Sequence, residues 1–139
     1  MVAIRPAQPS DLPAISALDA RLTGLDKPQY WRDMLAPERN FLVAESEAGK
    51  LLGFIAGEVR AWEFGQPAAG WVFAIQIDPK LRLKGVGTAL FEALVARFKA
   101  EGVTRVRTLV DRKDHLILSF FRAQGMVAGP SLQLDMDLA

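Results

Sequence analysis

The sequence predicts a mixed α/β (α+β) fold, and three observations lead to this class. The chain has 139 residues, the size of one ordinary domain, so we expect a single domain over residues 1–139. Half of the residues are hydrophobic, which is enough to bury a core. Apolar runs typical of strands alternate with helical periodicity. The predicted order is strand, two helices, three strands, helix, strand, helix, and one or two final strands.

The first half of the chain is predicted to hold three strands and two helices. Ser10 or Asp11 can cap the first helix, which carries apolar residues at helical spacing and ends near Gly24. Pro37 stops the second helix. We expect helices at 12–24 and 28–35, and strands at 2–5, 41–45 and 51–62, the last two joined by a turn at 47–50.

The second half begins with a loop and then an aromatic and β-branched strand, which Asp78 and Pro79 close. A helix follows, with Gly102 as its stop, and then another strand. Asp114 can cap a last helix that Gly125 ends, and the alternating residues after it predict a half-exposed final strand. We expect the loop at 64–70, strands at 71–77, 103–110 and 132–138, and helices at 89–101 and 114–124.

Composition excludes several classes of protein. The formal net charge of +1 argues against nucleic-acid binding by bulk electrostatics. The absence of cysteine excludes disulfides and thiolate chemistry, and the single histidine, His115, leaves no imidazole cluster for a metal. Neither a signal peptide nor an apolar run of membrane length is present. We therefore expect a cytoplasmic protein with no metal, nucleic-acid or membrane partner.

The most informative segment is the glycine loop, residues 82–88, which reads Arg-Leu-Lys-Gly-Val-Gly-Thr between a strand and a helix. A loop that opens a helix presents backbone N–H groups at the positive end of the helix dipole, which favours phosphate binding. Gly85 and Gly87 allow close approach of a ligand, and Arg82 and Lys84 add positive charge. The alternative is an ordinary strand–helix turn that uses glycine for tightness.

Three known phosphate-binding loop patterns can be compared with this segment. The dinucleotide fingerprint fails because Leu90 stands where its third glycine belongs, and the P-loop fails because Gly-Lys-Thr does not occur. The pattern R-x-x-G-x-G after a strand ending in Asp-Pro resembles the acyl-CoA loop of the GNAT N-acetyltransferase superfamily. The opening residues 4–7 with Asp11, and the spacing of residues 114–126, are similar to further GNAT blocks. The resemblance therefore covers essentially the whole chain.

This resemblance implies a GNAT fold with a mixed, mostly antiparallel sheet of six to seven strands and about four helices. It also implies an acetyl-CoA-dependent N-acetyltransferase, in which a primary amine of a small molecule or peptide attacks the thioester directly. A homodimer is possible. In the third block Phe121 replaces the tyrosine that usually serves as general acid, and phenylalanine cannot donate a proton. The alternative function is therefore a non-catalytic acyl-CoA-binding regulator with the same fold.

The resemblance also implies which residues contact the cofactor. Backbone N–H groups of the glycine loop would hold the pyrophosphate, and the strand before it would pair with the pantetheine arm. An N–H near Ile75 or Gln76, where the strands diverge, would stabilise the oxyanion. The expected cofactor residues are Ile75, Gln76, Ile77, Arg82, Leu83, Lys84, Gly85, Val86, Gly87, Thr88, Asp114, Phe120 and Phe121.

Glu58 is the first candidate for the base that deprotonates the amine, and Glu63 is the second. The alternative for Glu58 is a surface ion pair with Arg60 or with a cross-strand residue. The resemblance implies that the acceptor lies between the early helices and the loop that joins the third and fourth strands, where aromatic residues gather. These expected acceptor residues are Tyr30, Trp31, Trp62, Phe64 and Trp71.

Overall fold

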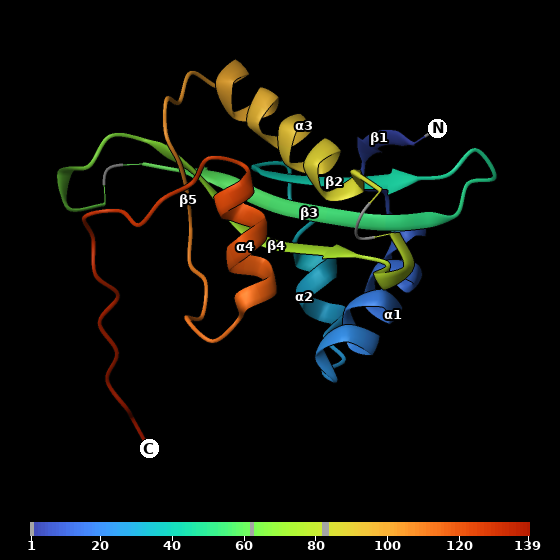
Figure 1. Ribbon diagram of the computed structural model, residues 1–139, viewed down its shortest axis with the longest axis horizontal. Helices are drawn as coiled ribbons and strands as arrows, with labels where there is room; N and C mark the ends of the chain where they lie inside the picture. The colour runs from blue at the N-terminus through green and yellow to red at the C-terminus, as the bar shows by residue number, and fades with distance from the viewer. Residues whose placement is uncertain (1, 62, 82–83) are drawn as a thin grey trace. The chain divides into compact units, whose positions relative to one another are not determined.

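The computed structural model describes residues 2–61, 63–81 and 84–139, and Figure 1 shows its helices and strands. The chain divides into two compact units, Met1–Leu109 and Val110–Ala139. The first unit contains a β-sheet with helices, and the second contains one α-helix. The predicted α/β class and the four expected α-helices are confirmed.

The sheet of the first unit contains five strands in the described residues, in the order β1-β2-β3-β4-β5. The first four strands pair antiparallel, and β5 lies parallel to β4. Their bounds are β1 Ala3–Pro6, β2 Arg39–Glu45, β3 Leu51–Arg60, β4 Ala69–Ile77 and β5 Val106–Thr108. The mixed, mostly antiparallel character is confirmed, but the sheet has fewer strands than the six to seven expected.

Helices α1 (Leu12–Thr23) and α2 (Pro28–Asp33) cover one face of this sheet (Figure 1). Gly24 has a φ of 77° and ends α1 as predicted, because glycine adopts this left-handed conformation at little cost. The apolar side chains of both helices pack on β2 and β3. The buried members of this cluster are Ile15, Leu18, Trp31, Met34, Phe41, Val43, Phe54 and Ala56.

Helix α3 (Val86–Ala100) covers the opposite face (Figure 1). Its side chains Leu90, Leu94 and Phe98 are fully buried, at successive turns of one helix face. An added Cβ at Gly70 of β4 would clash with the Phe98 ring, and one at Gly57 of β3 would clash with the Trp71 carbonyl and lie 3.1 Å from the same ring. Glycine at these two positions therefore allows α3 to approach the sheet closely.

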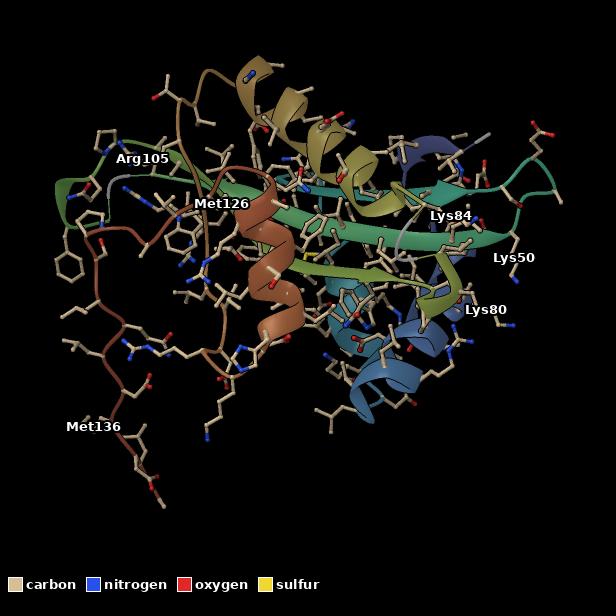
Figure 2. All side chains as sticks on the ribbon, in the orientation of Figure 1. Lys50, Lys80, Lys84, Arg105, Met126 and Met136 are labelled. Carbon is tan, nitrogen blue, oxygen red and sulfur yellow. The ribbon has the colours of Figure 1, made fainter. Side chains whose placement is uncertain are left out.

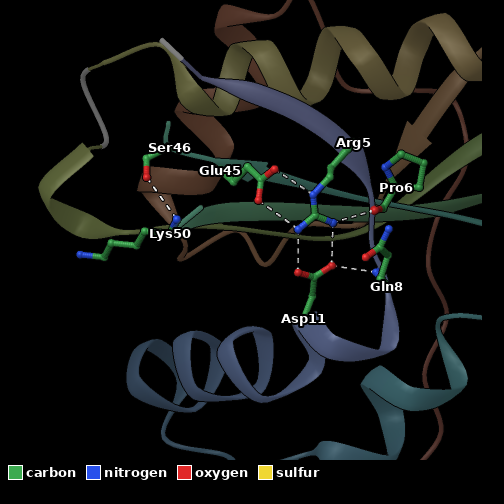
Figure 3. A network of polar contacts seen from close by, with 7 residues as sticks. All are labelled: Arg5, Pro6, Gln8, Asp11, Glu45, Ser46 and Lys50. Atoms are coloured by element: carbon green, nitrogen blue, oxygen red, sulfur yellow. Dashed lines mark hydrogen bonds and ion pairs between the residues drawn. The ribbon is translucent and has the colours of Figure 1, made fainter. Parts of the chain in front are cut away.

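Arg5 ties β1 to β2 and to the start of α1 (Figure 3). Its guanidinium donates to both oxygens of Asp11, at 2.8 Å each, and to both oxygens of Glu45, at 3.0 and 3.1 Å. Asp11 stands at the N-cap position of α1, as predicted, but its side chain makes no cap hydrogen bond to that helix. Its carboxylate accepts the N–H of Gln8 instead, at 2.7 Å.

The variant Arg5→Gln is expected to be less stable than the wild type by about 1–2 kcal/mol at neutral pH. The hydrogen bond from Arg5 lowers the pKa of Asp11. A carboxyl group with a lowered folded pKa stabilises the fold above its unfolded pKa of about 3.9, and this contribution is lost as the pH falls through the folded value. Urea unfolding of both proteins from neutral to acidic pH should show the difference shrinking. A difference that stays constant would contradict this account.

The second unit contains α4 (His115–Ala123), which begins where predicted. The Asp114 carboxylate caps it by accepting the N–H of Ile117 at 3.1 Å, and Gly125 follows it with a φ of 100°. Residues 126–139 contain neither helix nor strand, so the predicted strand at 132–138 is wrong. Its alternating apolar side chains are all exposed. A segment in which apolar and polar residues alternate forms a strand only when another strand lies beside it. Residues 132–138 pair with no strand that the structure describes.

Candidate active site

The glycine loop joins β4 to α3 after a short 3-10 turn at Pro79–Leu81. Arg82 and Leu83 lie outside the described residues. Gly85 is the N-cap of α3 and has a φ of 79°, a conformation that favours glycine. Val86 and Gly87 are buried in the first turn of the helix, whereas Lys84 is exposed (Figure 2).

The start of α3 is suited to an anion. The first N–H groups of a helix have no acceptor within the helix and lie at the positive end of its dipole. No side chain caps this helix at Gly85, and an added Cβ on Gly85 would meet nothing within 4 Å. Lys84 brings a positive charge beside these groups. Backbone donors, open space and a cation together fit a phosphate group.

Strand β4 loses one of its two neighbours before it ends. It pairs with β3 along its length, but with β5 only at Gly70, Trp71 and Val72. Among the described residues, no strand lies beside the other edge of β4 from Ala74 to Ile77. The Asp78 N–H donates to the Leu52 carbonyl on β3 at 2.9 Å.

Because successive residues of a strand direct their backbone groups to alternate sides, the register decides which groups face this edge. Asp78 and Gln76 turn theirs toward β3, so Ile77 and Ile75 turn theirs away from it. We call these groups of Ile75 and Ile77 the open edge of β4. The open edge leads directly into the turn before the glycine loop.

One additional residue bends β4 where β5 ends. Ala56 pairs with Ala74 but Gly57 pairs with Val72, so Phe73 is the extra residue of a β-bulge. Val72 is also the last residue of β4 with a partner on β5, and its carbonyl accepts the Thr108 hydroxyl at 2.9 Å. The expectation from sequence is that β4 diverges from its neighbouring strand near Ile75 or Gln76. The structure places the bulge slightly earlier, and no sequence feature of Phe73 indicates it.

Glu58 lies on β3 with Arg39 of β2 directly opposite on one side and Trp71 of β4 on the other. Arg39 Nε lies 3.4 Å from Glu58 Oε2, and the Glu58 side chain is 21% exposed. Another nitrogen of Arg39 donates to the Asp33 carbonyl at the end of α2, at 2.7 Å. Glu58 therefore forms an ion pair with a cross-strand residue, Arg39, which is one of the two ion-pair partners that the sequence left open, the other being Arg60. The carboxylate still keeps contact with solvent.

Aromatic side chains lie near Glu58 on the face of the sheet that α2 covers. Trp71 shares this face because it is the direct partner of Glu58, and the Arg60 guanidinium lies 5.4 Å from the centre of the Trp71 ring. Tyr30 of α2 is 42% exposed. Burial raises the pKa of Tyr30, and the charge of Arg39 acts to lower it.

Trp31 does not reach an acceptor surface, which corrects the expectation from sequence. It is 1% exposed and packs between Phe41 and Phe54 in the core. Its indole N–H donates to Asp19 Oδ2 at 3.3 Å, and Lys27 Nζ lies 3.2 Å from the same oxygen. Asp19 is itself 2% exposed. Sequence reasoning missed this buried carboxylate, although its place on the apolar stripe of α1 was a signal.

The connection from β3 to β4 carries three further candidates. Phe64 is fully exposed and has a φ of 48°, which is uncommon for a residue other than glycine. Glu63 belongs to the same 3-10 segment, Glu63–Gly65, and Trp62 lies outside the described residues. The roles of all three stay predictions.

In the second unit, three candidates lie on or beside α4. The Asp114 carboxylate is the cap of the helix, as described above. Phe121 is 4% exposed, and its ring centre lies 5.3 Å from that of Phe120. Their expected contacts with the cofactor stay predictions.

Within residues 2–61, 63–81 and 84–139, no group of three or more His, Asp or Glu side chains is arranged to hold a metal ion. None of the helices in these ranges is both long and apolar enough to cross a bilayer.

Residues 8–126 match the model of the acetyltransferase (GNAT) family. Mycothiol acetyltransferases of Kocuria rhizophila and Propionibacterium freudenreichii subsp. shermanii are 31% and 33% identical over 70% and 81% of this chain. The chain spans only about a third of their length, 31% and 33%. An L-2,4-diaminobutyric acid acetyltransferase of Nocardia farcinica is 30% identical over 66% of this chain and 45% of its own length.

Solved structures share the fold over nearly the whole chain. The aminoglycoside 6'-N-acetyltransferase AAC(6')-Ih of Acinetobacter baumannii superposes with a TM-score of 0.86 at 16% identity, covering 100% of both chains. Aminoglycoside N-acetyltransferase AAC(6')-Iy, solved in complex with CoA, also gives 0.86, at 15% identity over 100% of this chain and 96% of its own. The chain belongs to the acetyltransferase (GNAT) family, whose cofactor is acetyl-CoA.

Proposed function

We propose that this chain transfers the acetyl group of acetyl-CoA to a primary amine of a small molecule. The observation that supports this proposal is the presence of two suitable backbone features close together in the chain. The open edge of β4 is followed by the short turn Pro79–Leu81 and, four residues after that turn, by the uncapped N-terminus of α3 at Gly85. A strand edge suits the amide-rich pantetheine arm, and a helix N-terminus suits the diphosphate. The described backbone on either side of residues 82–83 can therefore hold both parts of the cofactor.

The N–H of Ile75 is the proposed donor to the oxyanion. Of the two candidates from sequence, Gln76 turns its backbone toward β3, whereas Ile75 turns its backbone toward the open edge. The bulge at Phe73 lies close by and gives β4 its bend. A donor fixed in this way typically contributes a few kcal/mol to transition-state stabilisation.

Glu58 is the proposed base. A primary alkylamine has a pKa of about 10.4 and arrives as a cation, so it must lose a proton before it attacks the thioester. Glu58 lies three residues along β3 from Ile55, the partner of Ile75, which is about 10 Å at the rise of a strand. The proposed proton path from the amine to the carboxylate therefore runs through water molecules. The ion pair with Arg39 holds the carboxylate on the face that Tyr30 and Trp71 also share.

The chemical step needs no general acid from this chain. The neutral amine nitrogen forms a bond to the thioester carbon and releases its second proton to solvent, the carbon–sulfur bond breaks, and the thiolate leaves with the electron pair. A thiol has a pKa of about 8.5, so its anion is an acceptable leaving group without a proton donor. Phe121 in place of tyrosine is therefore compatible with catalysis.

The acceptor is proposed to be a small amine with apolar or cyclic character. Tyr30 and Trp71 offer aromatic surface, and Glu58 offers a negative charge to the ammonium group. Curated relatives are named for small-molecule acceptors, mycothiol and L-2,4-diaminobutyric acid among them. This favours a small molecule over a protein amine.

A thiol-release assay tests the proposal, and the absence of cysteine from the chain keeps its background low. The purified protein is incubated with acetyl-CoA and a panel of amines, comprising L-2,4-diaminobutyric acid, an aminoglycoside, simple alkylamines and a lysine peptide. We expect amine-dependent release of CoA with at least one small amine. Tight binding of acetyl-CoA without transfer to any amine would contradict the proposal and support the acyl-CoA-binding regulator.

A further inference from the structure

Two arginines at β5 lie on the face of the sheet that also holds Glu58. Arg107 of β5 pairs directly with Trp71 of β4, and Trp71 pairs on its other side with Glu58 of β3. Directly paired residues of neighbouring strands have their side chains on the same face of a sheet. Arg105 (Figure 2) lies two positions before Arg107, and its carbonyl accepts the Gly70 N–H at 2.9 Å, so it continues the same alternation.

Neither arginine has an acidic partner in the part of the chain that the structure describes. No carboxylate there lies within ion-pair distance of Arg105 or Arg107. Strands β3, β4 and β5 contain a single acidic residue, Glu58, and Arg39 already pairs with it. Arg107 is half-buried. A cation that is partly removed from water is costly unless an anion stands beside it, so this face is suited to an anionic group that these strands do not supply.

The ring of Trp71 lies between the negative and the positive groups. Glu58 flanks Trp71 on β3 and Arg107 flanks it on β5, so at the usual strand spacing the Cα atoms of these two residues are about 10 Å apart. Arg60 adds a third cation, whose guanidinium lies 5.4 Å from the centre of the Trp71 ring. A molecule a few bonds long that lies over this ring can therefore contact both side chains.

The diphosphate of the cofactor does not account for these cations. It is proposed to bind at the start of α3, beyond the C-terminal end of β4, whereas Trp71 and Arg107 lie near the N-terminal end of that strand. Six residues of β4 separate Trp71 from Ile77, which is about 20 Å in a strand. Helix α3 also covers the opposite face of the sheet (Figure 1). The two arginines therefore form a separate anionic site.

We infer that Arg105 and Arg107 bind an anionic group of the acceptor, a carboxylate or a phosphate, so that the substrate is a small amine that also carries such a group, as amino acids do. The inference rests on the proposed function for the fate of the amine. The ammonium group lies at Glu58, the anionic group lies at the two arginines, and the carbon chain lies over Trp71. The planar guanidinium group donates two parallel hydrogen bonds to such an anion, which adds geometric selectivity to the attraction of charge.

Binding of matched ligands provides the first test and needs no turnover. L-2,4-Diaminobutyric acid and 1,3-diaminopropane differ by the carboxylate alone, and O-phosphoethanolamine and ethanolamine differ by the phosphate alone. Each is titrated calorimetrically into protein saturated with CoA, which has no acetyl group to transfer. We expect the anionic member of at least one pair to bind at least about tenfold more tightly than its neutral or cationic counterpart, and the pair concerned identifies the anion.

Arginine variants show whether this difference comes from the proposed site. In R105Q/R107Q the two members of each pair should bind equally. The matched control is R97Q, which removes an exposed arginine of α3 on the opposite face and should keep the wild-type difference. Melting temperatures confirm that each variant is folded. Equal affinity within both pairs in the wild type, or a difference that survives in R105Q/R107Q, would overturn the inference.

Charge reversal provides the second test, in the transfer assay. Arg107→Glu should reverse the order of kcat/KM, so that 1,3-diaminopropane is preferred over L-2,4-diaminobutyric acid, whereas Arg107→Lys should keep the wild-type order because it keeps the charge. The change should appear in KM, since the arginines hold a group away from the reacting atoms. Selective binding without transfer to any amine would contradict the proposed function alone. Transfer with no preference for anionic acceptors would contradict the anionic site alone.

Discussion

The variant Glu58→Gln is expected to lose at least a hundredfold in kcat, with little change in its affinity for acetyl-CoA. Glutamine keeps the shape of the side chain but cannot take a proton from the acceptor ammonium. A positioned general base typically raises the reaction rate by a factor of about 10²–10⁴. The cofactor is proposed to be held by Ile75, Ile77 and the start of α3, none of which contacts Glu58 through its side chain.

Glu92 provides the matched control for this prediction. It is an exposed glutamate on α3, and Glu92→Gln makes the same chemical change away from the proposed base. Stability must be measured beside activity, because Glu58 also forms the ion pair with Arg39. If Glu58→Gln lowers the melting temperature but leaves kcat within a few-fold of the wild type, Glu58 is a structural ion-pair residue and not the base.

The variant Gly85→Val is expected to weaken acetyl-CoA binding by at least about tenfold, which corresponds to about 1.4 kcal/mol. Two effects act together. A branched side chain at a φ of 79° strains the start of α3, and its methyl groups enter the open space where the phosphate would lie. Isothermal titration calorimetry with acetyl-CoA measures the loss.

Gly49 separates these two effects. Its φ is 80° and an added Cβ would also meet nothing within 4 Å, but it lies in the turn between β2 and β3. Gly49→Val should therefore lower stability as much as Gly85→Val does, while acetyl-CoA affinity stays at the wild-type value. Equal losses of affinity in both variants would mean that general destabilisation, and not a blocked phosphate site, explains the result.

Much of the fold could be predicted because its signals are local. Gly24 and Gly125 end helices, Asp114 caps one, and the α3 apolar residues recur at helical spacing; the structure confirms each of these. The final strand could not be judged in this way. Its alternation is a property of the segment, whereas a strand exists only when another strand lies beside it.

The site was less predictable because its geometry depends on pairing between strands. The bulge at Phe73 exists only relative to Ala56 and Gly57 on β3, and the partner of Glu58 follows from the register with β2. The sequence of a single strand does not determine which residues it pairs with on its neighbour. Trp31 was misassigned for the same reason, because its burial depends on Phe41 and Phe54, which come later in the chain.

The backbone at the start of α3 is proposed to bind the diphosphate of the cofactor. This can be measured by calorimetric titration of the wild-type protein with acetyl-CoA and with S-acetylpantetheine, which lacks the diphosphate together with the 3′-phosphoadenosine. We expect a clear binding heat with acetyl-CoA and an affinity at least about tenfold weaker for the truncated compound. No heat with acetyl-CoA, or equal affinity for the two compounds, would contradict it.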